Sequence, residues 1–460
     1  MEIIQQTALK VALPPALSSQ VLQSIGRSDR LTDGNLLVCW DHDESEVLAR
    51  ILDNEQPNPN LPDVPSPMLR DYKWPGIFQP FEHQKTTASF LSIRRRAFCF
   101  SEMGVGKTSS AIWAADYLMD IGAVKRVLVI CPLSIMYSAW QADIFKTAMH
   151  RTAVVAYGDK NKRDKAINGT YDFVIINYEG VGISYDAILK SDFDLIIVDE
   201  ANAYKNASTK RWKILSKVLT PNTRLWMMTG TPAAQSPIDA FGLAKMVSPS
   251  RIPKFSTAWR DKVTAQITRF RWVPKKTSRA DVHYALQPAI RFTKKECLDI
   301  PDVTYVTREV PMTAQVTKFY KLLKTQMMIE AANTRVSAVN AAASLSKLLQ
   351  ISGGAVYTDH HQVIEFDVTP RLEVLGEVLD ETTNKVVVFV PFLHTIEIVR
   401  KFLGTHGITA EVIQGSVSPR ERSEIINRFQ TQDNPRASNR RPPEPPMPDS
   451  TSGCIGPQDR

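Results

Sequence analysis

The stretch "RAFCFSEMGVGKTSSAIWAADYL", residues 96–118, joins an apolar run typical of a strand to an alanine-rich run typical of a helix. Gly104 and Gly106 lie between the two runs. There they allow backbone N–H groups to turn toward one point, and the start of the helix adds a dipole that favours an anion. Lys107 can neutralise phosphate oxygens, and Thr108 can ligate Mg²⁺. The stretch therefore predicts a loop that binds the phosphates of a nucleotide.

One position departs from the general pattern GxxxxGK[ST] of such loops. Ser101 stands where that pattern has its first glycine. An ordinary glycine turn between a strand and a helix is therefore the alternative for this stretch, and a second element is needed to decide between the two.

An acidic pair at the end of another buried-strand pattern, "DLIIVDEAN" at residues 194–202, supplies that element. Asp199 can hold Mg²⁺, often through water, and Glu200 can polarise the attacking water in in-line phosphoryl transfer. Acidic pairs after strands also serve as helix N-caps. Because a lysine loop precedes this pair in the chain, the pair favours a Mg-nucleotide site. The expected catalytic residues are Lys107 and Glu200, and the expected metal ligands are Thr108 and Asp199.

Five continuous Val/Ile/Leu runs, each ending in polar residues, occur between residues 71 and 250: "RVLVICP", "TAVVAYG", "DFVIINY", "DLIIVDE" and "RLWMMTG". Such runs suit strands buried on both faces of a parallel sheet, and helical patterns alternate with them. The carboxyl ends of these strands are then the expected place of the chemistry. A second pattern of this kind begins at residue 385 with "KVVVFVPFLHTIEIVRKFLGTHGITAEVIQG". The sequence therefore predicts an α/β fold.

In their order along the chain, these elements resemble the superfamily-two helicase-like ATPases, and within them the Swi/Snf-type DNA translocases, including phage members. "SEMGVGKT" is similar to the family's DEMGLGKT, "VDEAN" to its DEAH element and "MTGTPAAQSPID" to its TGTP element. Further elements are resembled by "FQPFEHQKTTASFL", "VICPLSIMYSAWQADI", "VIINYEG", "LQPAIRFTKKECLDIP" and "VIQGSVSPRERSEIINRFQ". The resemblance covers about residues 75–430. It implies two RecA-like P-loop lobes with parallel sheets, the second incomplete, joined by a helical interlobe region.

The resemblance also implies ATP and Mg²⁺ as cofactors and DNA, expected to be double-stranded, as the partner. Gln84 matches a glutamine that contacts adenine, and the residues expected to bind the nucleotide are Gln84, Met103, Gly104, Val105, Gly106, Lys107, Thr108 and Ser109. The expected coupling residues are Thr229, Gly230 and Thr231, although such a sequence also forms plain β-turns. The candidate DNA contacts are Ser134, Tyr178, Lys294 and Lys295.

Asn202 departs from the family pattern, because it stands where the DEAH element has histidine. An amide does not titrate as an imidazole does, which puts the family's coupling in doubt here. It can still form hydrogen bonds.

Residues 251–296 carry twelve Lys or Arg against three Asp or Glu. The cations are interleaved with Phe255, Trp259, Phe270 and Trp272, so they are candidates for contact with DNA phosphates. The alternative is a solvated helical face over buried aromatic side chains.

Changes in composition divide the chain into five predicted parts. These are a small N-terminal module with a Pro-rich linker at 1–70, a RecA-like ATP-binding lobe at 71–250, a basic and helical interlobe region at 251–370, the start of a second RecA-like lobe at 371–436, and a disordered or aberrant tail at 437–460.

The tail holds six prolines in 24 residues and no apolar periodicity, so we expect no buried strand in it. The family resemblance would require a strand, a DNA-contact element and an arginine-rich element at this point. We therefore expect poor ATP hydrolysis unless the missing part is supplied. The abrupt change in composition near residue 437 resembles a truncation or a shift of reading frame. A natural disordered tail is the alternative.

The whole-chain numbers discriminate less. A net charge of +8 and a pI near 9.1 favour an anionic partner, but they also fit proteins that bind none. Five scattered cysteines give no zinc spacing, and neither a long apolar run nor a secretory signal is present. We expect a soluble, intracellular monomer without a membrane partner, in the cytoplasm of a bacterium or of an infected bacterial host. Protein partners cannot be read from the sequence.

The sequence is compatible with three functions. The first is an ATP-driven motor on DNA. The second is an RNA helicase or a restriction-type translocase, which would keep the nucleotide site and change the substrate. The third is a non-catalytic protein that binds nucleotide or DNA and no longer turns over.

Overall fold

The computed structural model describes residues 1–460 except 56–60, 234, 269–270, 334–337, 358–361 and 433–460. The chain divides into two compact units, Met1–Asp302 and Val303–Arg460, and each is described by itself. The tail predicted at 437–460 lies outside the described residues. Among the described helices, none combines the length and the hydropathy of a membrane-spanning segment.

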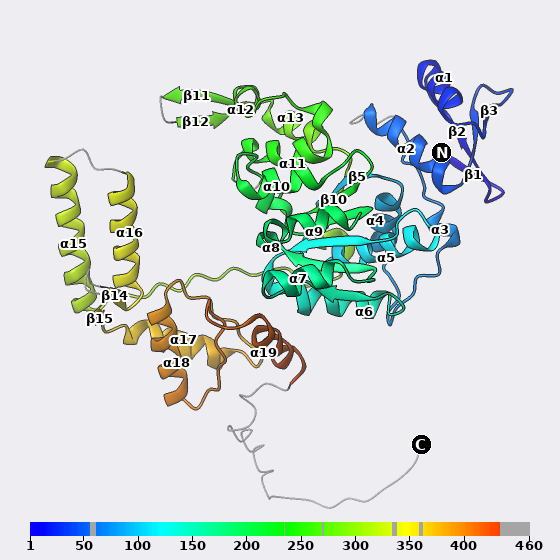
Figure 1. The fold of residues 1–460 in the computed structure, drawn as a ribbon. Helices are drawn as coiled ribbons and strands as arrows, with labels where there is room; N and C mark the ends of the chain where they lie inside the picture. The colour runs from blue at the N-terminus through cyan, green and yellow to red at the C-terminus, as the bar shows by residue number, and fades with distance from the viewer. Residues whose placement is uncertain (56–60, 234, 269–270, 334–337, 358–361, 433–460) are drawn as a thin grey trace, which may run out of the picture. The chain divides into compact units, whose positions relative to one another are not determined.

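The first unit is built on a seven-stranded parallel sheet (Figure 1). Its strand order is β13-β5-β10-β9-β6-β8-β7. The strands are β5 Arg96–Cys99, β6 Val127–Cys131, β7 Ala153–Val155, β8 Phe173–Asn177, β9 Leu195–Val198, β10 Arg224–Met228 and β13 Ala289–Ile290. All five apolar runs predicted as parallel strands are strands of this sheet, which confirms the predicted α/β class.

Successive residues of a strand point to opposite faces, and each face of the sheet has its own apolar core. Phe98 of β5 belongs to the same core as Trp259, while Ala97 belongs to the other core, with Trp113 and Trp226. The second core is covered by α4 Glu82–Ser92, α5 Lys107–Asp120 and α6 Ala142–Thr147. The first core is covered by α8 Tyr178–Ile183, α9 Tyr185–Lys190, α10 Lys210–Val218, α11 Ala240–Val247, α12 Ser256–Val263 and α13 Ser278–Ala285.

Shorter elements complete this unit. They are α3 Met68–Asp71, η1 Leu133–Ile135, the π-helical turn η2 Met136–Gln141, α7 Lys160–Ile167, η3 Ala201–Tyr204, η4 Pro237–Asp239, η5 Pro249–Arg251, α14 Lys294–Cys297 and an antiparallel hairpin of β11 Thr264–Thr268 with β12 Arg271–Pro274.

The N-terminal residues form a four-stranded antiparallel sheet of order β1-β2-β4-β3. Its strands are β1 Glu2–Ile4, β2 Ala8–Val11, β3 Ser28–Arg30 and β4 Leu36–Cys39, with helices α1 Pro15–Ser24 and α2 His42–Asn54. This sheet was not foreseen, because its strands of three and four residues are too short to give a periodic pattern.

Ion pairs join helix α2 of this sheet to the parallel sheet. The Glu46 carboxylate lies 2.7 Å from Nε of Arg95 and also pairs with Arg224. Asp53 accepts two hydrogen bonds from Arg94, at 2.9 and 3.0 Å. Burial opposes ionisation of Glu46, but the His42 side chain and the two arginines outweigh it and lower the pKa of Glu46 to about 2.

The second unit is mainly helical. Its elements are α15 Ala314–Asn333, α16 Ala338–Ser352, the hairpin of β14 Ala355–Tyr357 with β15 Val363–Glu365, α17 Thr369–Glu381, α18 Leu393–Thr405 and α19 Pro419–Thr431. The helix pair α15 and α16 lies within the region 251–370, which the sequence predicted to be helical.

The parallel strands expected after residue 385 are absent from the described part of this unit. Residues 385–390 and 409–414 belong to no strand, and Phe389 is 92% exposed. An apolar run becomes a strand only where another segment offers a hydrogen-bonding ladder. No described segment of this unit pairs with either run.

We expect Glu46→Gln to lower the free energy of unfolding by about 2 kcal/mol at pH 7, because charge-assisted hydrogen bonds contribute about that much. The pKa of Glu46 is depressed in the folded state, so its contribution is complete above the unfolded pKa. It is lost as the pH falls toward about 2. Urea unfolding from pH 7 down to pH 2 measures the difference.

Glu55→Gln is the matched control, because Glu55 is exposed just beyond the end of the same helix. Equal unfolding curves for the two variants at pH 7 would contradict a stabilising role of the Glu46 pairs.

Candidate nucleotide site

The loop between β5 and α5 has the backbone shape that its glycines allow. Gly104 and Gly106 have φ angles of +88° and +80°, a region that disfavours residues with a Cβ. A Cβ on Gly106 would also lie 1.9 Å from Nε2 of Gln84. Lys107 is the first residue of α5, and its buried ammonium donates to the carbonyl of Glu102 at 3.0 Å.

Helix α4 holds the other side of this loop. Oε1 of Gln84 accepts from the backbone N–H of Phe81 at 3.0 Å, which fixes the side chain against Gly106. His83 Nε2 lies 2.9 Å from the carbonyl of Val105, and because a carbonyl only accepts, this nitrogen donates. The sequence analysis did not predict the contact of His83 with the loop. The only signal for it was that His83 precedes Gln84 in the chain.

The acidic pair follows β9. Asp199 is buried, and its Oδ2 accepts from the indole N–H of Trp140 at 3.0 Å. Burial raises the pKa of Asp199, while the hydrogen bonds from Trp140 and from the backbone of Glu200 act in the opposite direction. Trp140 comes from η2, 59 residues away in the chain, and nothing in the sequence indicated this contact.

Glu200 itself has a left-handed backbone, with φ of +47°. This conformation is unfavourable for a residue with a long side chain and is found where neighbours hold it. Here the hydroxyl of Tyr178 donates to the carbonyl of Asp199 at 2.7 Å and to that of Glu200 at 3.2 Å. The hydroxyl of Tyr178, predicted to contact DNA, is thus directed at the backbone of the acidic pair.

The turn after β10 joins the acidic pair through side chains. Thr229 Oγ1 donates to the Glu200 carboxylate at 3.4 Å, and the N–H of Thr231 donates to Thr229 Oγ1 at 3.3 Å. Asn202 donates through Nδ2 to the carbonyl oxygen of Thr231 at 2.6 Å and to its Oγ1 at 3.0 Å. The amide that replaces histidine therefore links the acidic pair to this turn.

The remaining predicted residues lie around this centre or on its rim. Ser109 is buried and Thr108 half-buried in the first turn of α5, while Met103 is 65% exposed in the loop. A Cβ on Gly230 would lie 3.8 Å from the backbone nitrogen of Met103. Ser134 is half-buried in η1, after β6, and Lys294 and Lys295 are exposed in α14.

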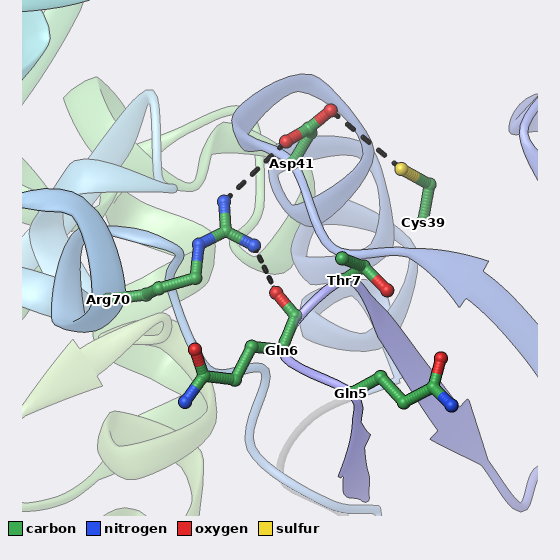
Figure 2. Close-up of a pocket in the computed structure, with 6 residues that line it drawn as sticks. All are labelled: Gln5, Gln6, Thr7, Cys39, Asp41 and Arg70. Carbon is green, nitrogen blue, oxygen red and sulfur yellow. Dashed lines mark hydrogen bonds and ion pairs between the residues drawn. The ribbon is translucent and has the colours of Figure 1, made fainter.

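A separate pocket of about 480 Å³ lies in the N-terminal residues (Figure 2). Gln5, Gln6 and Thr7 line it with Arg70, whose guanidinium pairs with Asp41. None of the predicted site residues lines it. Its cation is already paired, so the pocket adds nothing to the nucleotide site.

The sequence of this chain matches the models of two known protein families. The SNF2-related domain matches residues 83–353, more than half of the chain. The chain belongs to this family. The helicase conserved C-terminal domain matches residues 370–436. The SNF2-family membership that the sequence motifs predicted is thus confirmed, and the large parallel sheet of the first unit agrees with the predicted α/β class.

Several relatives of this SNF2-family chain are known. Putative protein p41 of Acyrthosiphon pisum secondary endosymbiont phage 1 is 24% identical over 322 residues, which cover 66% of this chain and 70% of the phage protein. Mouse chromodomain-helicase-DNA-binding protein 1-like is 26% identical over 358 residues, 72% of this chain and 38% of the mouse protein. The chain therefore spans well under half of the mouse relative.

A solved structure, the Sulfolobus solfataricus SWI2/SNF2 ATPase core in complex with dsDNA, is 21% identical to this SNF2-family chain. The match covers 79% of this chain and 77% of the Sulfolobus chain, with a TM-score of 0.45.

We expect Gly106→Ala to weaken nucleotide binding at least tenfold. The new methyl group meets a left-handed backbone and the amide of Gln84, so the loop and Gln84 must both shift. Titration calorimetry with ATP measures the affinity.

Gly122→Ala is the matched control. Gly122 has a φ of +73°, beyond the other end of the same helix, and nothing lies within 4 Å of its added Cβ. Both variants should lose stability through their left-handed backbone, and Gly106→Ala should lose more because of its clash with Gln84; only Gly106→Ala should lose affinity. A similar loss of affinity in both would count against a steric role of Gly106.

Proposed function

We propose that this chain is an ATP-driven motor that moves along double-stranded DNA without necessarily separating its strands. The strongest support is one set of contacts at one edge of the sheet. There the lysine loop follows β5, the acidic pair follows β9, and the turn after β10 contacts the acidic pair. A motor needs all three functions in one place: holding phosphate, activating water and passing on the state of the site.

Each residue has a role that suits its surroundings. The buried ammonium of Lys107 would neutralise phosphate oxygens, and Glu200 would polarise the attacking water. The buried carboxylate of Asp199 and the hydroxyl of Thr108 are hard oxygen donors, which fits Mg²⁺. They would hold the ion, whose chemistry is to neutralise charge on the phosphates. Gln84, fixed beside the loop, would contact the base.

The basic region 251–296 supports DNA as the track, with one correction to its aromatic residues. Trp259 is fully buried and belongs to the core, whereas Phe255 is 64% exposed with the ammonium of Lys254 over its ring at 5.5 Å. Phe270 lies outside the described residues. Exposed cations such as Lys254 would contact phosphates without reading bases, so binding should weaken steeply with salt.

ATP hydrolysis by the purified chain, with duplex DNA, single-stranded DNA, RNA or no nucleic acid, tests this function. We expect the largest stimulation with duplex DNA. Lys107→Ala should reduce both binding and turnover about a hundredfold, because the phosphate charge is left unneutralised. Glu200→Gln should keep ATP bound and slow turnover about a hundredfold, because the amide keeps the shape without the base.

Lys125→Ala is the control for loss of charge, since Lys125 is exposed on the same unit. Stimulation by RNA above that by duplex DNA would favour the RNA helicase. Nucleotide binding without turnover under every condition would favour the non-catalytic alternative.

A separate prediction concerns the coupling residues. Asn202→Ala removes both hydrogen bonds to Thr231, so the acidic pair loses a link to the turn at 229–231. We expect the stimulation of hydrolysis by DNA to fall about threefold to tenfold, with ATP affinity unchanged. Asn222→Ala, at an exposed position before β10, is the comparison. Identical stimulation in the two variants would exclude Asn202 from coupling.

A further inference from the structure

Residues 288–294, here called the strap, run along the phosphate loop on the outer side of β5. The N–H of Phe100 donates to the carbonyl of Ile290 at 2.8 Å, and the N–H of Glu102 donates to that of Phe292 at 2.9 Å. The strap thus continues the ladder of β13 with β5 beyond the end of both strands and onto the loop itself.

Two side chains of the loop fix the strap. Ser101 Oγ accepts from the N–H of Phe292 at 3.1 Å, and the Glu102 carboxylate accepts from the N–H of Lys294 at 3.0 Å. Ser101 is the residue that replaces the first glycine of the general loop pattern, and a glycine could not make this contact. The departure in the sequence is therefore where the loop binds a neighbouring segment.

These contacts bring the side chain of Lys294 over the loop. A Cβ built on Gly104 would lie 3.4 Å from Cε of Lys294 and 3.9 Å from its Nζ. Within the part of the chain that the structure describes, no carboxylate forms an ion pair with this ammonium, whereas Lys107 is already bonded to the Glu102 carbonyl. An unpaired cation at a glycine-rich loop attracts an anion that reaches the same loop.

We propose that Lys294 binds the phosphates of the nucleotide from the strap side, opposite Lys107 on helix α5. This assignment rests on the proposed nucleotide site and adds to it a residue from outside the loop. The expected ligand is a nucleoside polyphosphate, because the ammonium of Lys294 lies beside the phosphate loop. An ammonium is a point charge, so it would contact the phosphates and would not select a base.

The same residue was predicted to contact DNA, so the two roles compete. Lys295, the next residue in α14, is also exposed, but among the described residues it is not one of the nearest neighbours of a Cβ added at Gly104 or Gly106. A DNA contact would use both lysines alike, because DNA phosphates bind any accessible cation. A nucleotide contact would use Lys294 alone.

The test measures ATP and ADP affinity of the full chain by titration calorimetry without DNA. Lys294→Ala and Lys294→Gln should bind both nucleotides about threefold to tenfold more weakly, the loss expected for a charge-assisted contact at an exposed site. Lys294→Arg should retain most of the affinity, because it keeps the charge. Arg291→Ala, which removes the same charge three residues earlier, should bind as the parent does. Equal unfolding temperatures establish that the variants are folded.

The outcomes separate this proposal from the proposed function. If Lys107→Ala loses affinity while Lys294→Ala and Lys294→Gln bind as the parent does, the nucleotide site stands and the role of Lys294 is refuted. If Lys294→Ala and Lys295→Ala weaken duplex DNA binding equally and leave ATP affinity intact, Lys294 is a DNA contact instead. If the parent binds no nucleotide, both proposals are refuted.

Discussion

The parallel order of neighbouring strands is the constraint on which the site depends. Parallel strands end at the same edge of a sheet, so the segments after β5, β10 and β9 emerge side by side. Because β10 lies between the other two, the turn at 229–231 stands between the lysine loop and the acidic pair. Residues more than a hundred positions apart, such as Met103 and Gly230, thus lie close together at this edge.

Much of the first unit could be predicted from the sequence because its signals are local. Continuous Val/Ile/Leu runs predict strands buried on both faces, and all five runs form strands. Glycines before a lysine predict a loop whose backbone only glycine tolerates, and Gly104 and Gly106 have such φ angles. In each case the physical cause lies within a few residues of the signal.

The contacts that escaped prediction join segments distant in the chain. Trp140 contacts Asp199 because β6 and β9 are neighbours in the sheet. The order of strands in a sheet cannot be deduced from local sequence patterns, so this contact could not be predicted. The strap meets the loop through β13, a strand of two residues that no periodicity could reveal. In the second unit, by contrast, strands were predicted that the described residues do not form. The apolar run at 385–390 satisfies every local rule for a strand, but a ladder needs a second segment, and a single run cannot say whether one is available.

The hydrogen bond from Trp140 to Asp199 also has an optical consequence. An indole whose N–H points at a carboxylate emits light at a wavelength and intensity that depend on the local field. Trp140 is fully buried and donates directly to Asp199, so its emission should change with the charge at the site, as one contribution among the eight tryptophans of the chain.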